Sequence, residues 1–446
     1  MEQKSALKII RYGTSAEQKF IDEFKNEFDL LVINGNMISH ASKAISKFVA
    51  TRRFSYIIDP LTHSLQHDIQ YIKGKNGKIK SSIQKMVDNY SDFVKEKIVD
   101  QERVLVPSDF EDESILQNFT SKVLDFQKNH VIETSKKRDY YKYLQYAKVT
   151  FEPKWLIVPY FMMNTKNYNK WIEINVRMID FSLEEYELDR IAAQIVIEKD
   201  ILEDSYYIED IIDKYSSYGI RNLLLWVDDF SAFESSRLLL NNFCKLIKGF
   251  SDNGINVYNL YGDYFSVLLC HENSKAKLQG VCHGIEYGEK RAIVPVGGGI
   301  PVNKYYLYPI HQRIEYGRVA TLLRFLEILP DNYERYYRDI CNCEQCKEII
   351  DDNLDNFAFY GDSKPIEIKR KTGATISRQY PTTEAKALCI NHFLFNKLKE
   401  WESIQSNDLL DLVDESIKSA EEYSPILGYD LVGTYELWKE VLYTHE

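Results

Sequence analysis

The sequence predicts an α/β protein built on a TIM-like (β/α)8 barrel with helical insertions, followed by a C-terminal subdomain. Three observations support this. Short β-branched or aromatic runs alternate with long amphipathic segments, as in parallel strands that are connected by helices. Nine such runs occur, close to the eight strands that a closed barrel needs. After the last run, three thiols fall within six residues, from Cys341 to Cys346, which indicates a separate unit.

The predicted strands follow one another along most of the chain. They are residues 7–12, 30–34, 54–59, 155–161, 194–197, 223–228, 257–261, 281–285 and 305–308. Between the first two, residues 15–28 begin with a serine cap and carry apolar residues at helical spacing, which completes a β-α-β unit. Because a barrel needs eight strands, one of the nine runs must be an accessory hairpin or an edge strand. The sequence leaves open which one.

Two parts of the chain are expected to be helical without intervening strands. Residues 79–100 and 114–148 have lysine-rich helical patterns with no convincing strand between them, so we predict a helical insertion at about 79–148. From residue 312 onward the chain is expected to be helical, apart from a polar and basic loop at about 351–383. The predicted domains are therefore a barrel over 1–330 and a helical C-terminal subdomain over 331–446.

The composition is that of an ordered globular protein. The 446 residues are 44% hydrophobic and 28% charged, with 19 Gly and 11 Pro, which excludes disordered and fibrous classes. No apolar run reaches the roughly 18 residues that cross a bilayer, and the first residues lack the apolar core of a secretory signal. We therefore expect a cytoplasmic protein. A net charge of −11 means that any nucleic-acid contact must be local.

The cysteine pattern predicts a metal site. Seven cysteines are too few, and odd in number, for a disulfide framework. Cys341, Cys343 and Cys346 with one imidazole form a standard closed zinc set, and we expect His392 to be the fourth ligand, with Cys389 as its rival. Since four protein ligands leave no open position, the predicted Zn2+ is structural.

Acidic residues follow several of the predicted strands. In a (β/α) barrel the carboxyl ends of the strands meet at one end, where active sites are built. These carboxylates are therefore expected to converge, although a single aspartate at a strand end is also a common helix cap. The residues are Asp59, Asp228, Asp229, Glu286 and Glu289.

Two glycine-containing segments lie near the end of the predicted barrel. Residues 284–289 and 297–299 would let a flat ligand approach the backbone closely, and the alternative is a pair of turns. The chain has neither a P-loop nor a dinucleotide-binding pattern.

Basic residues cluster in the loop between the thiols and His392. Lys364, Lys369, Arg370, Lys371 and Arg378 are suited to phosphate contacts, with Tyr380 available for stacking; the alternative is ordinary solvated surface. Two further clusters of basic residues are more typical of ordinary solvated surface. They are Lys73, Lys75, Lys78 and Lys80, and Lys136, Lys137 and Arg138.

Together these segments resemble the tRNA-guanine transglycosylase superfamily. The last strands lead into a Cys-x-Cys-x-x-Cys and later His module, as in that family. Segment 9–14 is similar to its first strand, with a Gly-Thr ending, and 31–36 to its second, with a Gly-Asn ending. Segments 57–59 and 224–229 are similar to its two aspartate-bearing strands, and 284–289 to its Gly-Leu-Ala-Val-Gly-Glu loop.

The chain also departs from the family pattern. Asp59 is followed by Pro60 instead of Ser-Gly-Gly, and no strand between Arg313 and Cys341 carries the family's nucleophilic aspartate. The gap from Cys346 to His392 is longer than usual, and no tRNA-gripping domain of the family's kind follows. These features look more like the divergent branch that inserts 7-deazaguanine bases into DNA.

The resemblance implies a glycosyltransferase of the pentosyltransferase type, which exchanges guanine for a 7-deazaguanine base in nucleic acid. DNA is the favoured partner and tRNA the alternative, with accessory DNA-modification proteins possible and no membrane partner. It implies catalytic roles for Asp59 and Asp228, with Asp229 in reserve.

The resemblance also implies that the base is bound at Gly284, Ile285 and Glu286 and that Glu289 orients this loop. His283 and His311 are lesser candidates for the active site. From a different functional class, the chain could be a non-catalytic scaffold that only grips nucleic acid.

Overall fold

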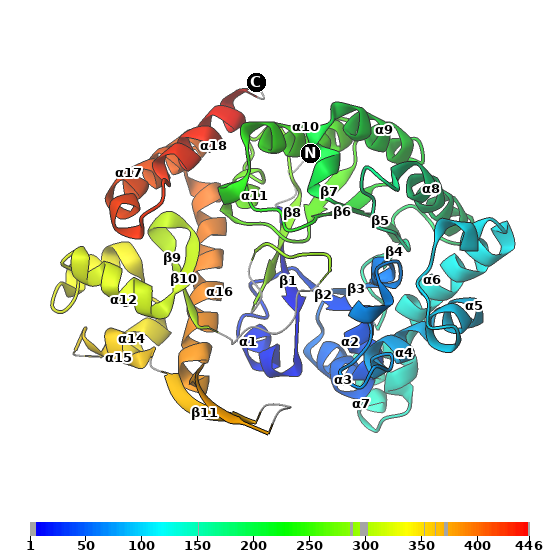
Figure 1. The fold of residues 1–446 in the computed structure, drawn as a ribbon, viewed down its shortest axis with the longest axis horizontal. Helices are drawn as coiled ribbons and strands as arrows, with labels where there is room; N and C mark the ends of the chain where they lie inside the picture. Colours follow the sequence, from blue (N-terminus) through cyan, green and yellow to red (C-terminus); the bar gives the residue numbers. More distant parts are fainter. Residues whose placement is uncertain are drawn as a thin grey trace. The chain divides into compact units, whose positions relative to one another are not determined.

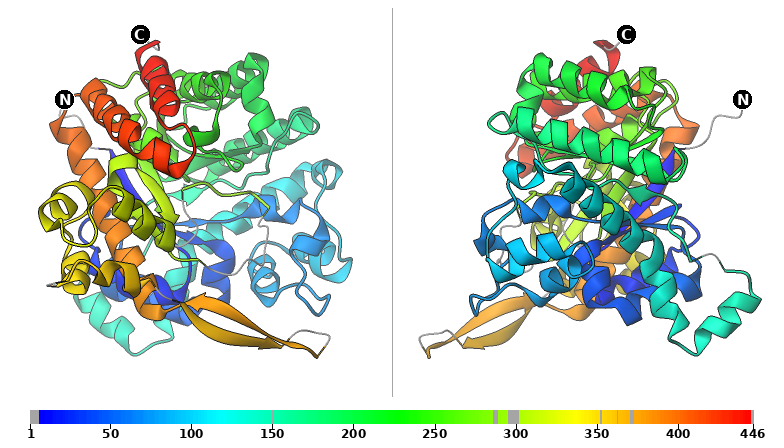
Figure 2. Two further views of the ribbon diagram at one scale, coloured as in Figure 1. Left: turned by 60° about the vertical axis from the view of Figure 1, so that its left-hand side comes forward. Right: turned by 90° about the vertical axis from the view of Figure 1, so that its right-hand side faces the viewer.

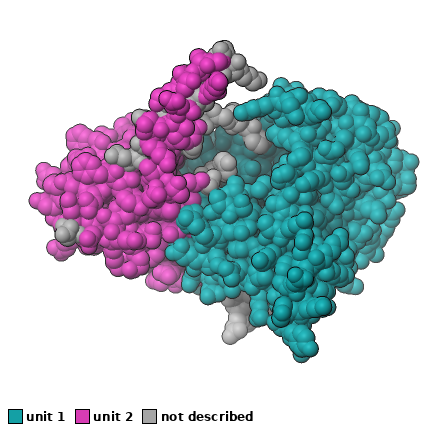
Figure 3. All heavy atoms as spheres, turned by 90° about the horizontal axis from the view of Figure 1, so that it is seen from below, with its two compact units in different colours: residues 1–295, 445–446 teal, residues 296–444 magenta. Residues whose placement is uncertain are grey.

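The computed structural model describes residues 6–149, 151–285, 289–294, 302–351, 353–361, 363–369 and 373–444. Two compact units emerge from the contact pattern: residues 1–295 with 445–446, and residues 296–444 (Figure 3). The boundary between the two units thus falls before residues 305–308, whereas the sequence suggested a boundary at residue 330. No helix of the described residues is long and apolar enough to cross a membrane.

Unit 1 is a TIM-like barrel of eight parallel strands with helices around it (Figure 1). In the sheet the strands are ordered β3-β2-β1-β8-β7-β6-β5-β4, so sequential strands are neighbours and β1 lies beside β8. The Lys154 amide donates to the Tyr56 carbonyl (2.8 Å), which joins the segment entering β4 to the start of β3. The strands are β1 Leu7–Tyr12, β2 Leu30–Asn34, β3 Tyr56–Asp59, β4 Leu156–Ile157, β5 Ile191–Ile197, β6 Asn222–Val227, β7 Asn256–Asn259 and β8 Gly280–Gly284.

The strand residues alternate between the barrel interior and the helical layer. Ile9, Val32 and Ile57 belong to the interior apolar cluster, while their neighbours Ile10 and Ile58 are also buried but point the other way. Because both faces are covered, the strands are nearly continuous apolar runs, which is why the sequence indicates all eight of them.

Helices follow most of the strands, and a helical insertion separates β3 from β4. The insertion predicted at about 79–148 is confirmed as helical and contains α4 Ser81–Val87, α5 Asp92–Lys95, a π-helical turn Glu96–Asp100, α6 Glu113–Lys136 and α7 Tyr140–Tyr146. The remaining helices of this unit are α1 Gln18–Glu23, α2 Gly35–His40, α3 Ser42–Arg52, α8 Tyr168–Glu185, α9 Ser205–Ser216, α10 Arg237–Asp252 and α11 Tyr264–Leu268.

Unit 2 is mainly helical and contains two antiparallel hairpins. The long helix α16 has buried residues along most of its length. The hairpins are β9 Lys304–Leu307 with β10 Gln312–Glu315, and β11 Ser363–Lys369 with β12 Thr375–Pro381. The helices are α12 Tyr316–Phe325, α13 Tyr333–Arg335, a π-helical turn Tyr336–Ile340, α14 Glu344–Ile350, α15 Asn356–Tyr360, α16 Thr383–Ser406, α17 Leu409–Leu427 and α18 Val432–Thr444.

Two sequence-based expectations for this part of the chain are wrong. Helices were expected from residue 312 onward, but Gln312–Glu315 form β10, which pairs with β9; residues 305–308 are thus the accessory hairpin strand that the sequence left unassigned among its nine runs. Within the predicted basic loop 351–383 lies the hairpin β11–β12, which extends as a two-stranded arm (Figure 2). Lys364, Ile366, Glu367 and Lys369 of β11 are exposed, so this strand is not held by burial of the kind that makes barrel strands long apolar runs.

Candidate functional site

The predicted metal ligands come together in unit 2. The ligand atoms of Cys341, Cys343, Cys346 and His392 all lie within 4.8 Å of one another, and all four residues are buried. The imidazole Nδ1 lies 3.1 Å from the Cys341 sulfur and 3.4 Å from that of Cys346. The group could therefore hold a metal ion.

Local structure positions the three sulfurs. Cys341 follows a π-helical turn, and Cys343 caps the N-terminus of α14, where its sulfur accepts the Cys346 amide (3.4 Å). The Cys341 sulfur in turn accepts the Cys343 amide (3.4 Å). These backbone N–H groups hold the Cys341 and Cys343 sulfurs in place.

The helix α16 supplies the fourth ligand. The Nε2 atom of His392 donates to the Tyr306 carbonyl (2.6 Å), which leaves Nδ1 facing the sulfurs. The Tyr305 ring stacks on the imidazole, with ring centroids 3.7 Å apart. Cys389, the rival ligand, is not part of the group, and burial raises the pKa of its thiol to about 12.

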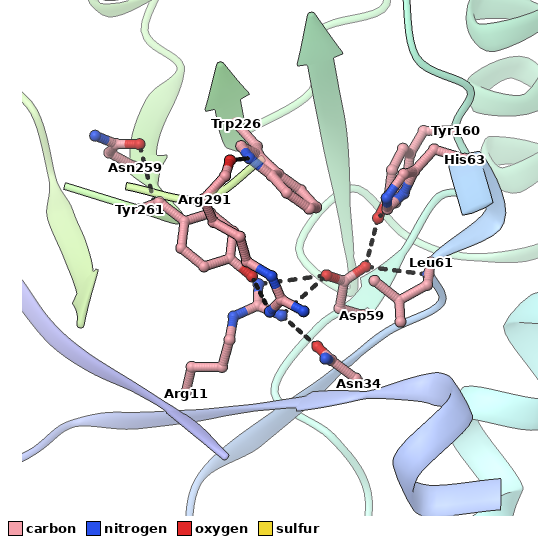
Figure 4. A network of polar contacts seen from close by, with 10 residues as sticks. All are labelled: Arg11, Asn34, Asp59, Leu61, His63, Tyr160, Trp226, Asn259, Tyr261 and Arg291. Atoms are coloured by element: carbon pink, nitrogen blue, oxygen red, sulfur yellow. Dashed lines mark hydrogen bonds and ion pairs between the residues drawn. The ribbon is translucent and has the colours of Figure 1, made fainter. Parts of the chain in front are cut away.

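A second polar cluster lies at the carboxyl ends of the barrel strands (Figure 4). Asp59, the last residue of β3, is wholly buried. Its Oδ2 accepts from the Arg11 guanidinium of β1 (3.4 Å), and Arg11 also donates to Asn34 at the end of β2. Its Oδ1 accepts from the Tyr160 hydroxyl (2.5 Å) and the Leu61 amide (3.1 Å).

The histidine His63 extends this cluster. Its Nδ1 lies 3.2 Å from the Tyr160 hydroxyl, and its ring packs edge-on against Trp226 (5.1 Å between centroids). Burial, with the nearby His67 and the cations Arg291 and Arg11, lowers the pKa of His63 well below its usual value. His63 is therefore a neutral imidazole at pH 7.

Two buried aromatic side chains, Trp226 and Tyr261, also belong to the cluster. The rings of Trp226 and Tyr261 have centroids 4.7 Å apart, and the Trp226 indole N–H donates to the Arg291 carbonyl (3.1 Å). The guanidinium of Arg11 lies over the Tyr261 ring (4.6 Å), and Arg291 donates to the Tyr261 hydroxyl (2.9 Å). Aromatic rings with cations nearby suit a planar polar ligand.

Asp228 and Asp229 lie at the same end of the barrel. Asp228, directly after β6, is half-buried and its Oδ1 accepts the Ile293 amide (2.6 Å). Burial, with the neighbouring Asp229, raises the pKa of Asp228. Asp229 has a positive φ of 44°, and its carbonyl accepts from Lys199 (3.0 Å).

The predicted base-binding loop begins at the end of β8. Gly284 is the last residue of this strand and is paired with Arg11, and Ile285 is buried. Glu289 is half-buried, and Glu286 lies outside the described residues.

The two lesser histidine candidates do not belong to this cluster. His283 alternates with Cys282, which points into the barrel, so His283 faces the helical layer. His311 lies in unit 2, where its ring contacts the buried Glu400 (2.7 Å).

Several residues of the cluster were not predicted. Arg11 and Asn34 are polar residues on the interior-facing positions of otherwise apolar strands, and this pattern is a signal that could have identified them. His63, Tyr160, Tyr261 and Arg291 lie in connecting segments and carry no such signal.

No protein-family profile and no curated protein matches the chain. Among solved structures, the chain is similar to an intracellular xylanase from Thermoanaerobacterium saccharolyticum, with a TM-score of 0.36 and 9% identity over 65% of this chain and 87% of that chain. Similarity at this level carries no argument about function.

Proposed function

We propose that this chain is a base-exchange transglycosylase that replaces guanine by a 7-deazaguanine derivative in nucleic acid, with DNA favoured as the substrate. The observation that carries the proposal is the combination of two features in one chain. Asp59 and Asp228 lie at the carboxyl ends of strands in a parallel eight-stranded barrel, and a buried Cys3His group follows. The same combination underlies the resemblance to the tRNA-guanine transglycosylase superfamily.

The proposed reaction proceeds in two displacements. A carboxylate attacks the sugar C1′, the C1′–N9 bond breaks, and guanine leaves with a proton from a second group, which takes up the N9 proton of the incoming base in the next step. N9 of the incoming base, as it loses its proton, then attacks C1′ and releases the carboxylate. The bonds formed and broken balance, so no oxidant or reductant is required.

The surroundings of the two acids favour different roles. Both oxygens of the wholly buried Asp59 accept hydrogen bonds, which suits a group that orients its neighbours. The Oδ2 atom of the half-buried Asp228 accepts none from the described residues, so a lone pair is available for attack. We assign the nucleophile to Asp228, with Asp229 in reserve.

The bound base would lie between the aromatic side chains and the end of β8. Trp226 and Tyr261 offer flat surfaces, and the backbone of Gly284 and Ile285 offers hydrogen-bonding groups at the strand end. Glu289 would orient this loop.

A metal in unit 2 would be structural. Three thiolates and one imidazole fit Zn2+, and a complete set of four protein ligands leaves no open position for a substrate.

The nucleic-acid partner is supported by the charge of the β11–β12 hairpin. Residues 363–381 contain five basic side chains and one acidic side chain, Glu367, in a protein of net charge −11. Lys364 and Lys369 of β11 are exposed and therefore available for phosphate contacts. A base inside a duplex must be flipped out or presented in a single strand, which accessory proteins could assist.

The deciding experiment measures the exchanged base itself. Purified protein is incubated with a labelled 7-deazaguanine precursor and with DNA or tRNA, and the nucleosides are analysed by mass spectrometry. The proposal expects label in DNA, and none with the Asp228→Asn variant. Label solely in tRNA would instead identify a tRNA-guanine transglycosylase.

A second candidate function is a non-catalytic scaffold that binds nucleic acid. The observation that favours it is the saturated hydrogen bonding of Asp59, which leaves that carboxylate no free lone pair for chemistry. Nucleic-acid binding without label in DNA or tRNA, with the accessory proteins present, would identify the scaffold.

A further inference from the structure

A basic and aromatic surface lies around α7, apart from the barrel-end cluster around Asp59. We call residues 136–148 the α7 surface. It contains one acidic residue, Asp139, and five basic ones, although the whole protein has a net charge of −11. The basic residues are Lys136, Lys137, Arg138, Lys142 and Lys148.

Most of this charge is not neutralised locally. Lys136 forms an exposed ion pair with Glu133 (2.7 Å). Lys137, Lys142 and Lys148 are exposed and form no ion pair with the described residues. A cluster of unpaired cations on an acidic protein creates a local site for a polyanion.

Two tyrosines stand among these cations. The side chains of Tyr143 and Tyr146 are 77% and 93% exposed, the two largest exposures among the large hydrophobic residues described. Since they are three residues apart in one helix, they lie on the same side of α7. Exposed aromatic rings interspersed with cations are the arrangement on which the bases of a single strand stack.

The α7 surface lies at the opposite end of the barrel from Asp59. The Tyr141 ring packs on Phe151 (5.4 Å between centroids), and the Phe151 carbonyl accepts from the hydroxyl of Tyr56 (2.5 Å). Tyr56 is the first residue of β3, whereas Asp59 is the last. In Figure 1, α7 lies at the lower edge of unit 1. The surface is therefore separate from the candidate active site.

We propose that the α7 surface is a second binding site of this protein and that it holds single-stranded nucleic acid through base stacking on Tyr143 and Tyr146 and phosphate contacts to the lysines. A single strand fits better than a duplex, whose bases are already stacked. An anionic membrane fits less well, because membrane-surface helices present Trp, Phe or Leu, and Leu144 is half-buried. The inference shares with the proposed function only the class of partner.

The first test removes the stacking platform. Binding of the full chain to a fluorescein-labelled oligothymidylate of about 20 nucleotides, which exceeds the span of one such site, is followed by anisotropy. Tyr143→Ala/Tyr146→Ala should weaken binding about 10-fold, in keeping with the loss of stacked bases. Tyr206→Ala, which removes a 61% exposed tyrosine from α9, is the matched control and should leave binding unchanged.

The second test removes charge. Lys137→Gln/Lys142→Gln/Lys148→Gln should reduce the salt dependence of log K by about 2, from roughly 0.7 per phosphate contact on a single strand. The control variant is Lys122→Gln/Lys170→Gln, which removes two exposed lysines elsewhere in unit 1 and should leave the slope unchanged.

The outcomes separate this inference from the proposed function. If the double tyrosine variant binds within about two-fold of the unaltered protein, the inference is overturned. It is also overturned if the lysine variant loses binding to phosphatidylserine vesicles but keeps its oligonucleotide affinity. Binding that depends on α7 in a protein without base exchange would support the inference and remove the proposed function.

Discussion

Single residues at the barrel end divide into those fixed by their neighbours and those left available. Asp59 and Arg11 are both buried, and each forms several polar contacts with residues distant in sequence. Removing two charges from water is costly unless geometry and hydrogen bonds compensate, so this pair is sensitive to the loss of either partner. Asp228 is more accessible and less constrained, which suits chemistry.

We expect Asp59→Asn to destabilise the protein by about 3 kcal/mol, because the Arg11 charge would remain buried without its counter-charge. Urea unfolding measures this change. The control Asp189→Asn, which removes the exposed ion pair with Arg221, should cost less than about 1 kcal/mol. Equal effects of the two substitutions would contradict the account of Asp59.

Asp228→Asn should have the opposite effect on stability. Since the folded-state pKa of Asp228 is raised, its ionised form is disfavoured in the folded protein at pH 7. The amide oxygen of the variant can still accept a hydrogen bond from the Ile293 amide. The free energy of unfolding at pH 7 should therefore rise slightly, by less than about 1 kcal/mol because the site is partly solvated, and the melting temperature should rise with it.

The difference should disappear below the unfolded pKa of about 3.9, where the carboxyl is neutral in both states. Melting curves at pH 7 and at about pH 3 test this sign. A variant that is less stable than the parent protein at pH 7 would show that the charge of Asp228 is stabilising.

Individual elements differ in how they are held. The helices α14 and α16 are brought together by the Cys3His group, and α16 also contains the fully buried Lys397 and Glu400, which form an ion pair (2.9 Å). The β11–β12 hairpin, in contrast, has exposed described residues along both strands. Two-stranded hairpins are marginally stable alone in water, so a charged partner would stabilise this one.

The metal site predicts that Cys343→Ser lowers both metal content and melting temperature, because ligation contributes to folding. Elemental analysis should find one metal ion per chain in the parent protein and less in the variant. Cys389→Ser is the matched control and should retain the metal, since this buried thiol is outside the ligand group. Parent protein without stoichiometric metal would contradict the prediction.

The hairpin predicts a salt-dependent contact with nucleic acid. Changing Lys369, Arg370 and Lys371 to Ala should weaken DNA binding and lower the slope of log K against log salt by about 2. Of these residues, Arg370 and Lys371 lie outside the described residues. Glu367→Gln on the same arm should strengthen binding, because it removes a negative charge. An unchanged slope in the triple variant would exclude the hairpin as a contact.

The whole molecule divides into two compact units, and all four residues of the Cys3His group belong to one of them. Chelation should therefore accelerate amide hydrogen exchange in residues 302–444 and leave the strands of residues 6–294 protected. Mass spectrometry of peptides from the exchanged protein measures both. Equal loss of protection in the two units would show that they unfold together.

The sequence by itself indicated nine strands, without deciding which eight form the barrel, and it identified the Cys3His group. Strands buried on both faces are continuous apolar runs, and the crowding of three thiols has no packing explanation, so both features can be read locally. The sequence could not show that 305–308 was the accessory run, because the choice of pairing partner is not encoded within a run.

Only the tertiary structure decided the surroundings of Asp59. Its partners Arg11 and Tyr160 lie 48 and 101 residues away in sequence, and no local pattern predicts that such distant groups will meet. The structure likewise decided the solvent-exposed hairpin β11–β12 and the exposure of Tyr143 and Tyr146. Burial and pairing are properties of the folded chain, because hydrophobic burial and hydrogen bonding depend on which groups the fold brings together.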